Sequence, residues 1–529
     1  MPSRRAEAVP CACAPLAGHG SIIHYSIPNK MRHILTTLIA TAVAAIAAQA
    51  QAVTAVTTAP GTLQSAIGTD AGAVSVLVVQ GPIDAGDMEF VNTRMPALET
   101  LDLKDATVEA YYGAGHSING VQRYDAGLLP PMIFAGLRAS SVTLPSMAGL
   151  RIGTGAFAGA SLATVTIPGN VAEVGDGAFA GCASLASATV EASAGLGTDI
   201  FAGCTALSEV RLPALAAIPV RMFDGCTSLA TVAAAPTLET IGEAAFRGCK
   251  SLKNFSFPAS LSSVGTSAFE SSGLETVDMS GCTSLFKVGE YAFANCASLA
   301  EAVFADNTSE MGEGALFNCA RLATLSLPGN LGGLGTALLS NAAIAGKFEL
   351  PKRAMTVGDY ALADAASITE VSVPSSLFYL GTEAMSGMSG LSRIDAKDLG
   401  SVPATGDDVW RGVDQPEVEL VVADGQYDAF KTAGQWKEFN IVKGSGTDDI
   451  ADIAEVSCRG RFVGTDLHIS ATGAELSRVM LYDVSGRLLA DVEAGGSEAV
   501  IPTSDYSARA YVAEVRLADG VRATVKLVR

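Results

Sequence analysis

A short phrase recurs through the middle of the chain and constrains its fold more than any other feature. It reads Gly-x-x-Ala-Phe-x-Gly-Cys-x-x-Leu and is followed by a β-type run that often ends in Pro, with clear copies at 175–185, 242–252 and 289–299. Its aromatic position, the anchor, recurs every 22 to 24 residues and is held by Phe134, Phe157, Phe179, Phe201, Phe223, Phe246, Phe269 and Phe293. Further on, at similar spacing, it is held by Leu316, Leu338, Leu362 and Met385. Self-similarity at this period predicts a solenoid.

The run after each phrase predicts the solenoid's strands. In residues 162–168, Val165 and Ile167 would point inward, whereas Thr164 and Thr166 would point outward, because side chains alternate along a strand. One repeat cannot bury its own apolar edge, so each depends on its neighbours. We therefore expect an α/β-type or mainly β repeat solenoid with a parallel sheet, in which the anchors are structural.

Six cysteines stand three residues after an anchor: Cys182, Cys204, Cys226, Cys249, Cys296 and Cys319. In a stacked solenoid such residues lie about 4.8 Å apart, whereas the Cβ atoms of a disulfide lie nearer ~3.8 Å. Zinc-type Cys-x-x-Cys spacing is absent from residues 53–529. We interpret the six cysteines as small thiols that pack the turn. Cys282 and Cys458 lie outside this register.

The phrase, together with the Leu-x-x-Val-x-Ile-Pro run, resembles the BspA-like class of leucine-rich repeats over roughly residues 60–442. The segment from Leu420 to Phe439, which contains Trp436, is similar to that family's closing unit. The resemblance implies leucine-rich repeats of 22–24 residues in a bacterial cell-surface or secreted protein. It also implies adhesin-like attachment to host proteins or to other bacteria.

The amino-terminal region carries a secretion pattern. Met31-Arg32-His33, the apolar stretch 34–48 and overlapping Ala-x-Ala sites predict a signal peptide over 31–52, so we expect a secreted or outer-surface protein. The stretch is too short to predict a transmembrane helix, and none is expected in the mature chain. We interpret 1–30 as a mis-called start, the alternative being a long n-region. Residues 53–133 would form an amino-terminal cap with a degenerate repeat, and 134–442 the repeats with their carboxyl-terminal cap.

The carboxyl-terminal region changes character. Residues 443–453 are rich in Gly and Asp and predict a linker. Residues 454–529 contain several short alternating runs, which predict a small β-sandwich. With its Asp-x-x-Gly-Arg turn at 483–487 and its lysine-bearing last strand, this region resembles the sorting domain of the type IX secretion system, whose machinery would then be a partner. Residues 507–510 stand where that domain carries Gly before its Tyr strand, and a plain β-sandwich appendage is the alternative.

Charge and residue types exclude several functions. The net charge is −20, and it becomes −23 without residues 1–52, which carry four basic residues and one acidic residue. Such a chain repels nucleic acid and anionic lipid. Residues 53–529 contain two histidines, His116 and His468, in no triad-like pattern. The glycines form no phosphate-binding motif. We expect no enzyme activity, no cofactor and no metal site.

Binding is the remaining hypothesis, and the outward strand positions are its candidates. They are Thr164, Thr166, Glu209, Arg211, Asn254, Ser256, Thr276, Asp278, Thr324, Ser326, Glu370, Ser372, Arg393 and Asp395. The predicted contact residues among them are Glu209, Arg211, Asn254, Thr276, Asp278, Glu370, Arg393 and Asp395. A broad ribbon of polar groups suits an extended extracellular protein or glycan. The alternatives are a structural surface spacer without a dedicated ligand and an accessory protein for glycan capture.

Overall fold

The computed structural model describes residues 51–529 except 69, 115–120, 193–194, 445–457, 473–474, 485, 507–509 and 519–521. Three sequence predictions therefore lie wholly or mostly outside the described residues. These are the start at Met31, the signal peptide and the linker at 443–453.

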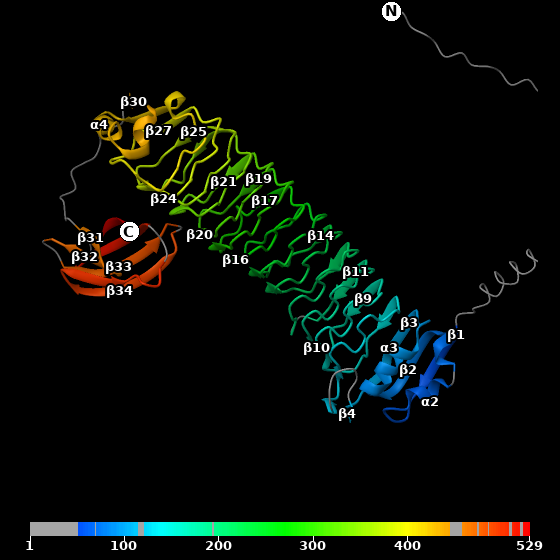
Figure 1. Ribbon diagram of the computed structural model, residues 1–529. Coiled ribbons are helices and arrows are strands. Elements are labelled where there is room, and N and C mark those ends of the chain that lie inside the picture. The colour runs from blue at the N-terminus through cyan, green and yellow to red at the C-terminus, as the bar shows by residue number, and fades with distance from the viewer. Residues whose placement is uncertain are drawn as a thin grey trace, which may run out of the picture. The chain divides into compact units, whose positions relative to one another are not determined.

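A solenoid of parallel strands makes up the larger part of the structure, which confirms the predicted fold class (Figure 1). Its turns place strands on two faces. The first face consists of three successive sheets. They are β1 (Gln51–Val56), β2 (Val74–Ile83), β3 (Thr100–Val108), β7 (Ser141–Thr143), β9 (Thr164–Ile167), β11 (Ser187–Val190), β12 (Glu209–Arg211) and β14 (Thr231–Val232); then β17 (Thr276–Asp278), β19 (Glu301–Val303) and β21 (Thr324–Ser326); then β23 (Gly346–Glu349), β25 (Ile368–Ser372), β27 (Arg393–Ala396), β29 (Glu419–Ala423) and β30 (Asn440–Gly444).

The second face is built from shorter strands, most of two residues. Its three sheets are β6 (Leu128–Leu129), β8 (Leu150–Ile152) and β10 (Val171–Val174); β13 (Ala217–Ile218), β15 (Thr240–Ile241), β16 (Ser263–Val264), β18 (Lys287–Val288) and β20 (Glu310–Met311); and β22 (Gly333–Leu334), β24 (Thr356–Val357), β26 (Tyr379–Leu380) and β28 (Ala404–Thr405). The register is that of a repeat: Ile218 pairs with Ile241, and Ile241 pairs with Val264.

The anchors form a buried stack between the two faces. All eight anchor phenylalanines are buried, and consecutive rings lie 5.1 to 5.9 Å apart, with planes within 22° of parallel. They are packing residues of the solenoid core. Aromatic stacking adds to the energy of burying each ring.

One anchor assignment was wrong. An anchor amide donates to the carbonyl of the residue before the next anchor, as Phe293 does to Ala315 at 2.9 Å. Leu316 donates to Leu338 at 3.1 Å, so Leu339, and not Leu338, occupies the anchor position. Both leucines are buried, because the neighbouring position also faces the core. By the same pattern, Met385 donates to Val409, which makes Trp410 the last anchor.

The glycine that opens each phrase is required by the approach of the preceding repeat. A Cβ atom on Gly242 would lie 2.7 Å from the amide nitrogen of Val220, and one on Gly289 would lie 2.5 Å from that of Thr266. Two residues after the anchor, the backbone adopts positive φ, at 71° for Gly248. Later repeats place Asn there, at 58° for Asn295, because Asn tolerates this conformation.

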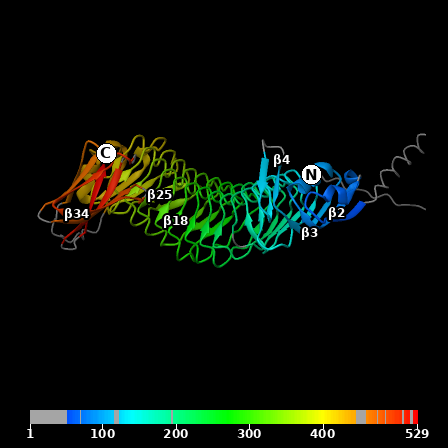
Figure 2. The same cartoon turned by 90° about the horizontal axis from the view of Figure 1, so that it is seen from below.

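The amino-terminal end of the solenoid carries its own helices: α2 (Leu63–Ile67), η1 (Ala71–Ala73) and α3 (Ala85–Arg94). A capping box between Asp84 and Asp87 begins α3. Asp87 is buried and also accepts from the amides of Gly61 at 2.7 Å and Leu63 at 2.9 Å, so it fastens this end together. A hairpin of β4 (Tyr111–Ala114) and β5 (Val121–Tyr124) stands away from the coil (Figure 2).

The other end of the solenoid is closed by η2 (Gln415–Glu417), η3 (Asp424–Gln426), α4 (Tyr427–Phe430) and η4 (Gly434–Glu438). Trp436 is buried, and its indole nitrogen donates to the Pro403 carbonyl at 2.9 Å. Its ring meets Trp410 edge to face at 5.3 Å. Both tryptophans of the chain therefore seal the last repeat.

Two antiparallel sheets follow at 458–529 and form a small β domain. One contains β31 (Cys458–Val463), β32 (Asp466–Ala471) and β35 (Glu498–Pro502), and the other contains β34 (Leu488–Gly496), β33 (Leu476–Asp483), β36 (Ala510–Leu517) and β37 (Arg522–Val528). Side chains from both sheets, among them Ile469, Val479 and Val515, share one core. We call residues 458–529 the C-terminal domain.

Candidate functional site

Outward residues of the first face form two files, because parallel strands in register place equivalent positions side by side. In the first file, Thr164 pairs with Ser187 and Ser187 with Glu209. In the second file, Thr166 pairs with Thr189 and Thr189 with Arg211. The interleaved residues, such as Val165 and Ala188, are buried. The files are therefore the surface that the first face offers to a ligand.

On β7, β9 and β11 these files carry hydroxyl groups and no charge, whereas on β3 the second file carries Asp102, which pairs with Thr143. Six outward residues on three adjacent strands are exposed or half-buried: Ser141, Thr143, Thr164, Thr166, Ser187 and Thr189. The sequence analysis named only the middle pair. The alternation of small polar and apolar residues in 141–143 and 187–190 could have identified the others. We call these six residues the hydroxyl patch.

The predicted charged contact residues are held by neighbouring charges. Arg211 lies 3.4 Å from Glu209 on the same strand, and Asp395 lies 3.1 Å from Lys397. Arg393 on β27 forms an ion pair with Glu419 on β29. These pairs place opposite charges side by side on the first face.

The remaining charged candidates are also partnered. Glu370 lies 3.9 Å from Lys347, its neighbour across β23 and β25. The carboxylate of Asp278 accepts from the hydroxyl of Ser280 at 2.7 Å and from its amide at 3.0 Å. These hydrogen bonds lower the pKa of Asp278 and keep it charged.

The predicted contact residues do not form one cluster. Glu209 and Arg211 belong to the first sheet, Thr276 and Asp278 to the second, and Glu370, Arg393 and Asp395 to the third. Asn254 and Ser256 are exposed, but their segment forms no strand, contrary to the prediction, and it separates β14 from β17. The large ring of Phe255 between them packs among Phe246, Phe257 and Phe269.

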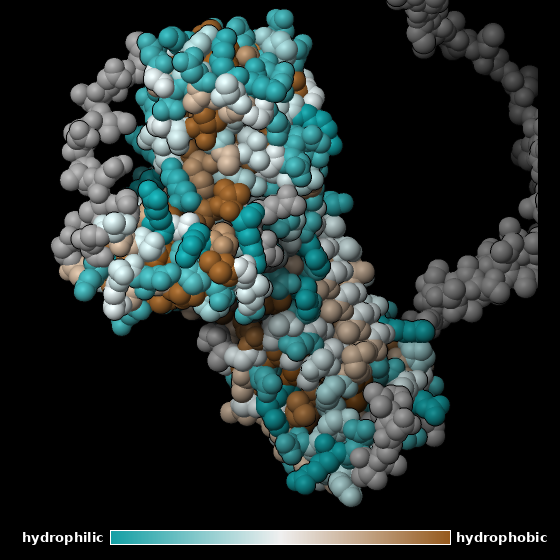
Figure 3. All heavy atoms as spheres, turned by 60° about the vertical axis from the view of Figure 1, so that its left-hand side comes forward, coloured by the Kyte–Doolittle hydropathy of each residue, from teal (hydrophilic) through white to brown (hydrophobic). Residues whose placement is uncertain are grey.

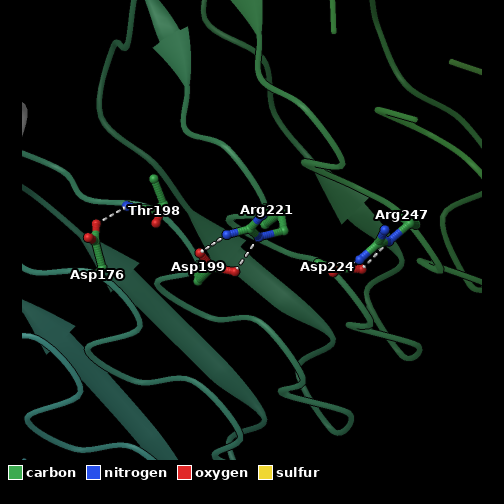
Figure 4. A network of polar contacts seen from close by, with 6 residues as sticks. All are labelled: Asp176, Thr198, Asp199, Arg221, Asp224 and Arg247. Carbon is green, nitrogen blue, oxygen red and sulfur yellow. Dashed lines mark hydrogen bonds and ion pairs between the residues drawn. The ribbon is translucent and has the colours of Figure 1, made fainter. Parts of the chain in front are cut away.

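A polar network links consecutive anchor turns, and the sequence analysis missed it (Figure 4). Arg221 donates to both carboxylate oxygens of Asp199 at 2.7 and 2.9 Å, and Arg247 donates to Asp224 at 3.0 Å. Within each pair, the acid and the arginine occupy the same repeat position in adjacent repeats. Opposite charges at one repeat position are therefore the sequence signal that could have revealed this network. Arg221 holds the pKa of Asp199 below its usual value. Because this network joins repeats to each other, its role is structural.

The buried cysteines are hydrogen-bonded packing groups. Cys182 donates to the Phe157 carbonyl at 3.2 Å, and Cys226 donates in the same way to Phe201 at 3.1 Å. Burial raises the pKa of Cys226 to about 12 and that of Cys296 to about 11, so neither is a thiolate at neutral pH. Cys282, outside the register, is also buried and lies 3.8 Å from the Phe257 carbonyl.

The described residues include neither a metal-type cluster nor an apolar helix of membrane-spanning length. Among them, no group of three or more His, Cys, Asp or Glu residues is placed to hold a metal ion. His468 lies beside Glu498, with 2.8 Å from Nδ1 to the carboxylate, on neighbouring strands of the C-terminal domain. Within the part of the chain that the structure describes, no helix is long and apolar enough to span a membrane.

Comparison with known proteins identifies the repeats. A family described as the BspA type leucine rich repeat region matches in six copies, over residues 129–235, 216–345 and 337–407. No curated protein matches the chain.

Two solved structures are among those similar to this chain. A leucine rich cell surface protein from Faecalibacterium prausnitzii is 17% identical over 56% of this chain and 87% of its own, with a TM-score of 0.32. A leucine-rich repeat protein from Bacteroides ovatus is 18% identical over 63% of this chain and 75% of its own, also with a TM-score of 0.32.

Proposed function

Because the chain belongs to the BspA-type leucine-rich repeat family, we propose that it is a secreted or outer-surface protein that binds an extracellular protein or glycan through its first face. The observation that carries this proposal is the exposure of the outward files. Thr164 and Thr166, Glu209 and Arg211, and Thr276 and Asp278 are exposed on strands whose intervening residues are buried. Extended surfaces of stacked repeats suit extended ligands.

The proposed role is binding without catalysis. Burial raises the pKa of the Cys226 and Cys296 thiols, and charged groups of the files are engaged with each other. Glu209, Arg211, Asn254, Thr276, Asp278, Glu370, Arg393 and Asp395 remain the proposed contact residues. The net charge of −20 disfavours nucleic acid as the ligand.

The hydroxyl patch favours a glycan within this proposal. Its six residues are uncharged, and hydroxyl groups both donate and accept hydrogen bonds, as sugar hydroxyls do. Glycan capture is therefore the second candidate function. Affinity electrophoresis separates it from protein adhesion, since a glycan binder is selectively retarded by a neutral polysaccharide in the gel.

A structural spacer is the opposing possibility, and the internally paired charges of β23 to β29 favour it. The test is an array of immobilised matrix proteins and of neutral and acidic polysaccharides, probed with the full mature chain. Saturable binding to one class supports the proposal. Uniform failure to bind would favour the spacer.

Export is proposed from the sequence pattern. Residues 31–52 would direct secretion, and residues 454–529 would engage the type IX secretion machinery. Mass spectrometry of the secreted protein should find a first peptide near residue 53, whereas a peptide from 1–30 would contradict the assigned start. Deleting 454–529 in a host with that machinery should abolish surface display, and unchanged display would contradict the sorting role.

A further inference from the structure

The strand β36 of the C-terminal domain is buried on both of its sides. Tyr511 and Ala513 point into the core of the domain. Ala510 and Val512 point the opposite way, yet they are only 0% and 3% exposed. A strand of a two-sheet domain normally leaves in water the side that faces away from the other sheet, so something outside the domain covers Ala510 and Val512.

The cover is the second face of the solenoid. Ala510 and Val512 form one apolar cluster with Phe378 and Tyr379, and Met355, Tyr482 and Val484 pack against it. Figure 3 shows apolar residues, in brown, gathered on this side of the molecule. Tyr379 is the outward residue of β26, since its neighbour Leu380 belongs to the solenoid core.

The outward positions of the second face change at the point of contact. Along β13 to β20 they are exposed or half-buried, as at Ala217, Ser263 and Lys287. Along β22 to β26 the equivalent positions are Gly333, Thr356 and Tyr379, which pair in series and are all buried. The charged outward residues Lys287 and Glu310 of β18 and β20 thus give way to uncharged residues where the C-terminal domain lies.

The glycines at this contact fit a close approach of two backbones. A Cβ atom on Gly333 would lie 2.5 Å from the carbonyl oxygen of Val484. One on Gly332 would lie 3.6 Å from the Cα of Gly486. Gly486 belongs to the Asp-x-x-Gly-Arg turn, so this turn also serves the contact.

Polar groups complete the contact on both sides of the apolar cluster. Thr356 Oγ1 donates a hydrogen bond to the Val484 carbonyl. Lys526 donates to the Ser376 carbonyl at 3.1 Å, and its ammonium group lies 5.2 Å from the centre of the Phe378 ring. A cation held over an aromatic face adds attraction to the burial.

We infer that the C-terminal domain is a built-in cover for the second face, docked on β22 to β26 through its β33–β34 turn and strands β36 and β37. In the intact chain it hides an apolar surface that includes Phe378 and Tyr379, and it leaves the first face as the accessible surface of these repeats. This inference does not depend on whether the first face binds a ligand.

The test uses the full chain and substitutions on both sides of the contact. Val512→Glu in the domain and Tyr379→Glu in the solenoid each place a charge in the cluster. Their controls are Val500→Glu, on the 44% exposed outward side of β35, and Ser263→Glu, on a half-buried outward position of β16. The readout is binding of an apolar dye, with circular dichroism as the folding check.

Both contact variants should raise dye binding several-fold while circular dichroism stays unchanged, and both controls should match wild type. Because one contact variant alters each partner, misfolding of one leaves the other informative. The inference is overturned if wild type binds the dye as strongly as the contact variants do. It is equally overturned if a correctly folded contact variant behaves as its control does.

Discussion

Phe246 stacks on Phe269 of the next repeat with ring centroids 5.1 Å apart and planes 13° from parallel. Consecutive anchor rings stack in the same way from Phe134 to Phe293, so each inner ring contacts the ring before it and the ring after it. A gap in this column removes contacts from two adjacent repeats at once.

Phe246→Ala should therefore destabilise the solenoid by about 3–5 kcal/mol, as expected for truncation of a buried aromatic residue. The measurement is urea denaturation followed by circular dichroism. Phe286→Ala is the matched control, because Phe286 is 48% exposed and its loss should change little. Equal effects of the two substitutions would mean that the stack does not hold the repeats together.

Gly242→Ala should be severely destabilising although it adds one methyl group. Its Cβ would lie 2.7 Å from the Val220 amide nitrogen, and backbone cannot move aside as a flexible side chain does. Gly281→Ala is the control, since no atom lies within 4 Å of its Cβ position. Thermal melting of the two variants compares them directly. Similar melting temperatures would show that the repeats are not packed this closely.

The Asp199–Arg221 ion pair predicts a dependence of stability on pH. The pair lowers the pKa of Asp199 below its usual 3.8. A carboxylate with a lowered pKa contributes stability above its unfolded pKa and loses it as the pH falls through the folded value. Asp199→Asn should thus melt below wild type at about pH 7, and the difference should vanish near about pH 2.

Differential scanning calorimetry at both pH values measures this difference. Asp398→Asn, at an exposed position, is the control and should follow wild type throughout. A difference for Asp199→Asn that persists at acid pH would point to lost packing and not to lost charge.

The cysteine ladder predicts selective thiol chemistry. Burial raises the pKa of Cys226 to about 12, whereas Cys458 is only half-buried. Iodoacetamide at about pH 8 should label Cys458 in the native protein and leave Cys182 through Cys319 unlabelled until denaturant is added. Peptide mass spectrometry reads each site. Native labelling of the ladder would contradict its burial.

The repeat period was sufficient to predict the solenoid, the inward phenylalanines and the outward threonines, because one 22–24 residue unit contains all of these positions. It misplaced one anchor at Leu338, since Leu338 and Leu339 are both apolar and both face the core. The opening Gly335, four residues before Leu339 as Gly242 is before Phe246, was the better guide.

Other structural features could not be predicted from the pattern of a single repeat. The two-residue strands of the second face are too short for an alternation pattern to reveal. Arg393 and Glu419 are separated by a repeat longer than the usual 22–24 residues. The repeat period therefore does not predict that they pair, and only the structure shows it. The contact between Tyr379 and Val512 joins segments that are remote in sequence. Near Tyr379, the local sequence signals this contact only by an aromatic residue at an outward strand position.

The central claim is that ligands bind the first face, and one comparison tests it most directly. Thr143→Glu/Thr166→Glu/Thr189→Glu places three charges in the hydroxyl patch, and Ala217→Glu/Thr240→Glu/Ser263→Glu places three on the outward side of the second face. The measurement is the dissociation constant for the arrayed matrix protein or polysaccharide that wild type binds, with melting temperature as the folding check. We expect the first-face variant to bind at least about tenfold more weakly and the second-face variant to bind as wild type does. Unchanged binding by the first-face variant, or loss only in the second-face variant, would contradict the account.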